Sequence, residues 1–147
     1  MLRITALLLL IATSSFVSCD DEVNVDFAFY CPTSCWFTVQ LWEWDSLSAD
    51  DMLSEKIKYR SEVSKQYVQY VSFNPILDGD EFGSRWYQFY ITVEHNCGIE
   101  ENKVLNTKIY LSPPCLIGKS CSRNFFVSLN HLQGESTIHD VMMQIQQ

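Results

Sequence analysis

Apolar and polar residues alternate through most of the chain after residue 24, which is typical of β-strands that bury one face. The clearest run is 86–95, where four apolar side chains fall on one face: Tyr87, Phe89, Ile91 and Val93. Five more segments alternate in this way or are rich in β-branched and aromatic residues: 25–30, 37–42, 67–73, 107–111 and 125–129. Turn formers separate these segments. The pattern predicts an all-β fold, a two-layer antiparallel sandwich.

Two short segments have helical features instead. Ser48 and the acidic residues after it resemble a capping box, which predicts a single helical turn presenting Met52 and Leu53. After Ser136, apolar residues recur at helical spacing, at positions 138, 141, 142 and 145. We therefore expect residues 136–147 to form a short C-terminal helix that docks on the sandwich, or a tail that meets a partner.

The N-terminus has the features of an export signal. A basic start at Arg3, an apolar stretch and a small-residue boundary predict a signal peptide over 1–19, followed by a β-sandwich domain over 20–135. The alternative is a bacterial surface lipoprotein boundary, in which Cys19 is acylated and becomes the first mature residue. Either route exports the chain, so we expect a secreted protein in the extracellular region or at the cell surface.

Composition narrows the classes of partner. The chain has 147 residues, 47% of them hydrophobic, and a formal net charge of -8. An acidic surface repels phosphate backbones, so nucleic acid is not an expected partner. After the N-terminal stretch no apolar run has the length of a transmembrane segment.

The cysteines predict disulfides. Export leaves five of them in the mature chain: Cys31, Cys35, Cys97, Cys115 and Cys121. In an oxidising compartment these are disulfide candidates and not a zinc site, since no histidine follows at zinc-ligand spacing. An odd count indicates a disulfide-linked dimer, a buried inert thiol or retention of Cys19. The spacing does not determine which cysteines pair.

Several segments together resemble the nematode transthyretin-like family. Residues 38–45 and 50–54 resemble its "V-x-L-W-E-x-D" strand and "D-D-L-L" turn, and 90–97 is similar to its "I-x-H-x-C" strand end. Residues 107–113 and 126–129 resemble its last two strands, and Cys31 lies where the family's first strand carries a cysteine. The turn at 61–67 departs from the family by lacking glycine, and Cys35, Cys115 and Cys121 have no assigned counterpart.

The resemblance implies both fold and function. It implies a transthyretin-like (prealbumin/Ig-like) β-sandwich that is secreted, needs no cofactor and acts as an extracellular or cell-surface linker. Its partner would be a protein receptor or an exposed lipid. The contrasting hypothesis is an enzyme, a hydroxyisourate hydrolase-like protein on the same scaffold. Such hydrolases end in Tyr-Arg-Gly-Ser, whereas this chain has residues 131–136 there, so we expect no enzyme activity and no catalytic residues.

Further residues are of types that take part in catalysis or binding. His95 could align Cys97 as a nucleophile, but a structural bridge is the favoured use of Cys97. The acidic segment 78–81 lacks the ligand spacing of a calcium loop, so no metal is expected. Two groups remain as binding candidates. They are the aromatic pair Trp42 and Trp44, and the basic cluster Lys56, Lys58, Arg60 and Lys65. Alternatively, the C-terminal helix covers the two tryptophans, and the basic cluster is an ordinary solvated strand edge.

Overall fold

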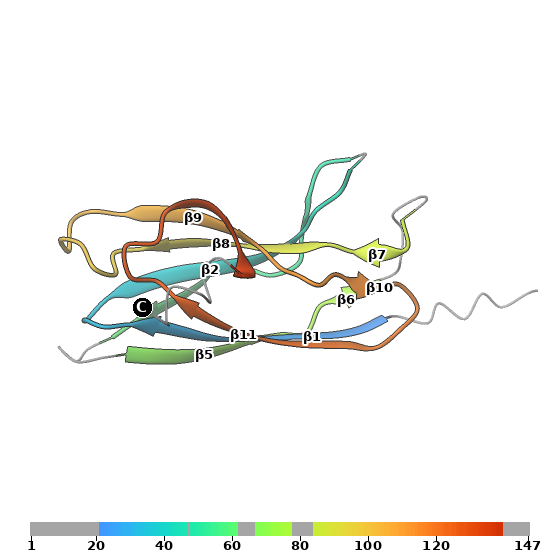
Figure 1. Cartoon of the computed structure of the whole chain (residues 1–147), viewed down its shortest axis with the longest axis horizontal. Helices are drawn as coiled ribbons and strands as arrows, with labels where there is room; N and C mark the ends of the chain where they lie inside the picture. Colours follow the sequence, from blue (N-terminus) through green and yellow to red (C-terminus); the bar gives the residue numbers. More distant parts are fainter. Residues whose placement is uncertain (1–20, 47, 62–66, 78–83, 140–147) are drawn as a thin grey trace, which may run out of the picture.

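The computed structural model describes residues 21–46, 48–61, 67–77 and 84–139, and these residues form two facing β-sheets (Figure 1). Sheet I has the order β11-β1-β5, with β6 also pairing with β1. Its strands are β1 (Asp21–Cys31), β5 (Tyr67–Phe73), β6 (Ile76–Leu77) and β11 (Cys121–Ser128).

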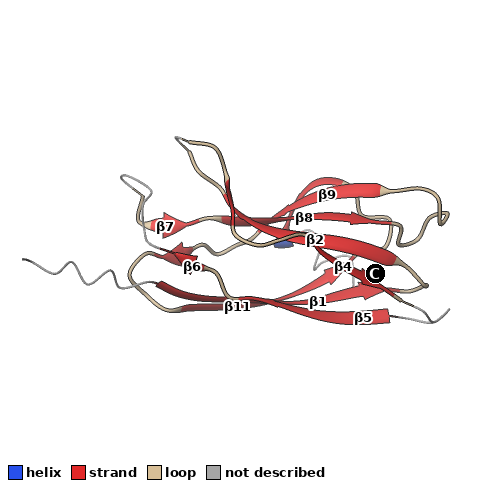
Figure 2. Cartoon of the chain, turned by 180° about the vertical axis from the view of Figure 1, so that it is seen from behind, coloured by secondary structure: helices blue, strands red, loops and turns tan. Residues whose placement is uncertain are grey.

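Sheet II has the order β12-β9-β8-β2-β3, with β4 also pairing with β2. Its strands are β2 (Trp36–Glu43), β3 (Asp51–Met52), β4 (Ile57–Arg60), β8 (Phe89–His95), β9 (Leu105–Tyr110) and β12 (Gly134–Thr137). A separate two-stranded sheet pairs β7 (Trp86–Tyr87) with β10 (Cys115–Leu116). The connection between β2 and β3 projects beyond the two layers in both views (Figure 2).

The core lies between the inner faces of the two sheets. In β1 every second residue from Val23 to Cys31 is buried, which follows from the two-residue period of a strand. Aromatic rings join the layers, since the Phe29 ring of sheet I lies 5.0 Å from the Phe37 ring of sheet II. The predicted inner face of 86–95 is confirmed, because its four side chains are all buried.

The expected all-β fold is confirmed, but the antiparallel prediction is wrong for two pairings. Strand β1 runs parallel to β11, and β9 runs parallel to β12. Parallel neighbours need a long crossover connection. Here five strands of sheet II, namely β2, β3, β4, β8 and β9, lie between β1 and β11 in the sequence, so the chain returns to sheet I in the direction of β1.

The predicted helical turn at residues 48–53 is also wrong. Asp51 and Met52 form β3, which pairs with Trp42 and Glu43 at the end of β2. Within this connection Ser48 donates a hydrogen bond to Asp45 at 2.7 Å. The Ser48 side chain therefore forms its hydrogen bond within a turn between strands and does not cap a helix.

The structure describes only part of the predicted C-terminal helix. Ser136 and Thr137, its first two residues, instead end strand β12 beside β9. Ile138 is buried in the core, and residues 140–147 lie outside the described residues. The predicted signal peptide, 1–19, lies outside them as well. In the part of the chain that the structure describes, no helix has the length and apolar character needed to span a bilayer.

A buried hydrogen bond holds the start of β1 to β7 at the same end of the molecule (Figure 1). The Tyr87 hydroxyl donates to Asp21 Oδ2 at 2.6 Å, and the Gly118 backbone N–H donates to the same oxygen at 2.8 Å. Both Tyr87 and Asp21 are buried. Their bond therefore fixes the first described strand against the β7–β10 region.

Replacing Tyr87 with phenylalanine is expected to lower the free energy of unfolding by about 2 kcal/mol, because the buried carboxylate loses a donor that water cannot replace. Urea unfolding at neutral pH measures this. Tyr70→Phe is the matched control, because Tyr70 is 75% exposed and its side chain is accessible to water. A loss as small as that of the control, within about 0.5 kcal/mol, would contradict the role of the Tyr87 hydroxyl.

Candidate functional site

Four cysteines form two disulfides and one stays reduced in the described residues. Cys31, at the end of β1, is bonded to Cys97, just after β8, so this bond joins the two sheets. Cys115 is bonded to Cys121 between β10 and β11. The prediction of disulfides is thereby confirmed. The unpaired cysteine is Cys35, and it is buried.

Cys35 lies beside the inter-sheet disulfide. The Sγ atoms of Cys31, Cys35 and Cys97 all lie within 4.8 Å of one another. Burial raises the pKa of the Cys35 thiol to about 11, so the thiol is protonated at neutral pH. Because Cys31 and Cys97 are bonded to each other, their sulfurs do not act as metal ligands in this state.

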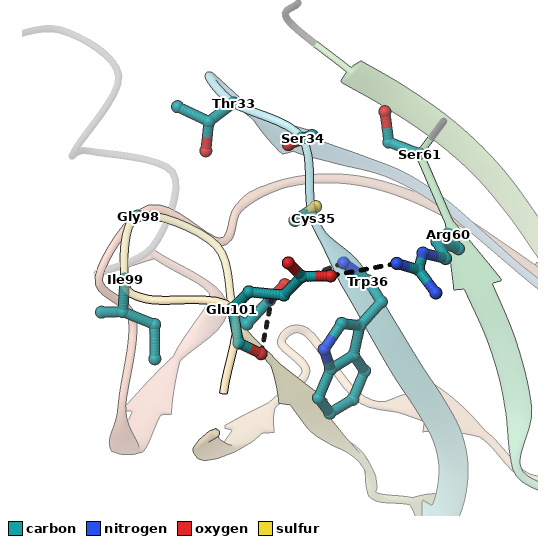
Figure 3. A pocket seen from close by; sticks show the side chains of 10 residues that line it. Thr33, Ser34, Cys35, Trp36, Arg60, Ser61, Gly98, Ile99 and Glu101 are labelled. Carbon is teal, nitrogen blue, oxygen red and sulfur yellow. Dashed lines mark hydrogen bonds and ion pairs between the residues drawn. The ribbon is translucent and has the colours of Figure 1, made fainter. Parts of the chain in front are cut away.

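A pocket of about 460 Å³ opens at this end of the sandwich, and we call it the thiol pocket (Figure 3). Its walls come from residues 33–36, from the end of β4 and from the β8–β9 connection. Arg60 and Glu101 form an ion pair of 3.1 Å across it. Asn96 accepts a hydrogen bond from the Trp36 backbone N–H at 2.8 Å, which ties two of the walls together.

His95 is a structural residue next to this pocket. Its Nδ1 accepts a hydrogen bond from the Cys97 N–H at 3.2 Å, so Nε2 carries the proton and donates to the Leu132 carbonyl at 2.8 Å. Burial lowers the pKa of His95 to about 4. Both ring nitrogens are engaged and Cys97 is bonded to Cys31, so the pair does not form a base and a nucleophile.

The outer face of sheet II carries a row of neighbouring rings, which we call the aromatic face: Trp42, Tyr90 and Tyr110. The Trp42 and Tyr90 rings are parallel within 2° at 6.1 Å, and the Tyr90 and Tyr110 rings lie 5.8 Å apart. Lys108 Nζ lies 3.8 Å from the centre of the Tyr90 ring. These contacts cross three neighbouring strands, β2, β8 and β9.

Polar contacts hold the rings in place. Trp42 donates its indole N–H to Thr92 at 3.0 Å, and the Tyr90 hydroxyl donates to Asp50 at 2.8 Å. Burial, followed by this bond to Asp50, raises the pKa of Tyr90 above its ordinary value. Lys108 also lies 3.9 Å from Asp50. The aromatic face is therefore fixed before any partner binds.

Two hollows border the aromatic face. One of about 460 Å³ lies beside Trp42, with Gln40, Glu94 and Lys108 among its lining residues. The other, of about 440 Å³, lies between Trp44, Tyr110 and Pro114. Tyr110 thus belongs both to the aromatic face and to the hollow that contains Trp44.

The structure separates the two tryptophans that the sequence grouped. Trp42 is half-buried against Tyr90, whereas Trp44 is 37% exposed at the rim of the second hollow. Trp44 lies just beyond the end of β2, so the alternation of that strand no longer decides its environment.

Each cation of the basic cluster that the structure describes contacts another side chain of the protein. Lys56 forms an ion pair with Glu94 at 2.9 Å, and Arg60 forms one with Glu101. Lys58 lies over the Trp36 ring, with Nζ 5.4 Å from its centre. Lys65 lies outside the described residues. The three described cations therefore each have a partner on the protein itself.

Sequence reasoning did not select Tyr90, Tyr110, Lys108 or Asp50, which complete the aromatic face. By the alternation of 86–95, position 90 falls on the face opposite the four apolar side chains. The missing information was the register that brings Tyr90 opposite Trp42 and Tyr110. That register depends on contacts between segments far apart in the sequence.

No family model, curated protein or solved structure matches the chain. The function is therefore inferred from the geometry described above.

Proposed function

We propose that this chain is a secreted, transthyretin-like binding protein that acts as an extracellular or cell-surface linker without catalysis. Its all-β, two-layer architecture supports the proposal, as do two disulfides of the kind that persist in oxidising compartments. The export signal and the family resemblance are the sequence arguments for the same function.

The observation that carries the proposal is the exposed indole of Trp44 beside the aromatic face. Trp44 borders a hollow whose wall includes Tyr110, and Tyr110 continues into the stacked rings of Tyr90 and Trp42. Aromatic side chains next to preformed hollows are typical of the centre of protein interfaces. Because the rings are already held by hydrogen bonds, binding would cost little side-chain entropy.

Charges near the face favour a protein receptor over an anionic lipid surface. Lys108 lies between two rings and close to Asp50, and Lys56 is bound by Glu94. Attraction to an anionic bilayer needs several free cations on one surface. A mixed polar and aromatic surface suits a protein with complementary polar groups.

Trp44→Ala is expected to weaken receptor binding by about tenfold or more, because it removes the exposed anchor of the interface. Oxidised full-length protein would first be used to capture receptors from extracellular fractions. Surface plasmon resonance then compares the captured receptor on wild type and on two variants. Trp86→Ala is the matched control, since Trp86 is another exposed indole, 46% accessible, on β7.

Equal losses in the two variants, or no loss in either, would contradict the assignment of the interface to Trp44. Binding to phosphatidylserine vesicles that neither variant changes would favour lipid as the partner. Turnover of hydroxyisourate by the purified protein would support the enzyme alternative.

A further inference from the structure

Three cysteine sulfurs lie close together, although only two of them are bonded, and the third belongs to Cys35 in the wall of the thiol pocket. Cys35 is a free thiol, and its Sγ lies within 4.8 Å of both sulfurs of the Cys31–Cys97 bond. We propose that Cys35 exchanges with this bond, so that the protein interconverts between a Cys31–Cys97 and a Cys35–Cys97 disulfide. The substrate of this reaction is the protein's own inter-sheet disulfide.

Strand register supports Cys97 as the new partner of Cys35. Phe37 of β2 lies opposite His95 of β8, and the Asn96 N–H donates to the Trp36 carbonyl, so the same register continued outward brings Cys35 opposite Cys97. Opposed residues on antiparallel strands have Cα atoms about 4.5–5.5 Å apart. This range lies within the spacing that a disulfide needs. The exchange therefore requires no change in the pairing of β2 with β8.

The chemistry balances without an added oxidant or reductant. Cys35 loses its proton to solvent, and the thiolate attacks Cys97 Sγ. A Cys35–Cys97 bond forms as the Cys31–Cys97 bond breaks, and Cys31 leaves as a thiolate that takes up a proton. Thr33 Oγ1 lies 3.8 Å from Cys31 Sγ, so its hydroxyl can donate to the leaving sulfur.

The rate of exchange should follow the thiolate fraction of Cys35. That fraction rises tenfold per pH unit while the pH is below the pKa of about 11. Titratable and charged groups near the three sulfurs come from β4, β5, β8 and the β8–β9 connection: Tyr59, Arg60, Tyr67, His95 and Glu101. His95 is neutral above its pKa of about 4, and burial raises the pKa of Tyr67. Neither of these two groups changes charge between about pH 7 and 9.

Exchange would change which parts of the fold are covalently joined. The Cys31–Cys97 bond links sheet I to sheet II, whereas a Cys35–Cys97 bond lies between neighbouring strands of sheet II. The product also carries its free thiol on Cys31, at the end of β1. The two isomers thus differ in the cross-link between layers while keeping the same number of disulfides.

Disulfide mapping of the native, full-length protein tests the proposal. Samples are held at about pH 7, 8 and 9 without added thiol, quenched in acid, unfolded and treated with N-ethylmaleimide before peptide mass spectrometry. We expect labelled Cys31 and a Cys35–Cys97 peptide to accumulate, with an initial rate that rises about tenfold per pH unit. The Cys115–Cys121 bond is the internal control and stays intact.

Two variants make the result decisive. Cys35→Ala should abolish labelling of Cys31 at every pH. Cys31→Ala should form the Cys35–Cys97 bond in air and keep a β-rich circular dichroism spectrum. The proposal is overturned if wild type labels Cys35 alone at pH 9, if Cys35 proves to be bonded to Cys19 or to a second chain, or if Cys31→Ala leaves Cys97 reduced.

Discussion

Replacing Cys31 and Cys97 together with alanine is expected to lower the free energy of unfolding by about 4 kcal/mol. The bond closes a loop with a sequence separation of 66, so its loss restores much conformational freedom to the unfolded chain. Both residues are also buried, and removal of their sulfurs weakens packing between the sheets. Guanidinium unfolding under non-reducing conditions measures the change.

The second disulfide provides the matched comparison. Cys115 and Cys121 are separated by only 6 positions, so the same double replacement there should cost about 2 kcal/mol. If the two double variants lose equal stability, loop closure does not explain the contribution of the inter-sheet bond.

Lowering the pH from about 7 to about 5 is expected to remove about 2 kcal/mol of stability through His95 alone. The pKa of His95 is about 4 in the folded protein and 6.5 as its ordinary value. Above pH 6.5 the ring is neutral in both states. Below that value His95 binds a proton in the unfolded chain but stays neutral in the folded chain. The stabilisation present above pH 6.5 is therefore lost as the pH falls toward 4.

His95→Gln isolates this effect, because glutamine can accept from the Cys97 N–H and donate to the Leu132 carbonyl but does not titrate in this range. Urea unfolding of both proteins at the two pH values gives the difference. The variant should lose about 2 kcal/mol less than wild type over this interval. An identical pH dependence in the two proteins would show that His95 protonation is not coupled to unfolding.

The strands and their inner faces were predictable because alternation is a local property. Segment 67–73 coincides with β5, and the buried positions of 86–95 follow directly from the two-residue period. The parallel pairing of β1 with β11 was not predictable in this way. It depends on the path of the chain through sheet II between these two strands. A local pattern of apolar and polar residues contains no information on that path.

The candidate sites were likewise predictable from the sequence only in part. The odd number of cysteines after the predicted signal peptide left open a disulfide-linked dimer, a buried inert thiol or retention of Cys19. Only the fold shows that Cys35 is the unpaired cysteine among the described residues and that it lies beside the Cys31–Cys97 bond. Likewise, Trp42 and Trp44 were identifiable as outward aromatic residues. Their different exposure results from Tyr90 and from the end of β2, and both effects require knowledge of strand register.

The parallel pairing of β1 and β11 also has a consequence for the order of folding. Strand β1 lies at the centre of sheet I, with β5 on one side and β11 on the other. Val23 pairs with Cys121 and Tyr30 with Ser128, so one edge of the first described strand has no native neighbour until β11 has been synthesised. Contacts between such distant segments slow folding and leave an open strand edge during synthesis. A nascent chain that stalls before β11 would therefore expose the edge of β1 to aggregation.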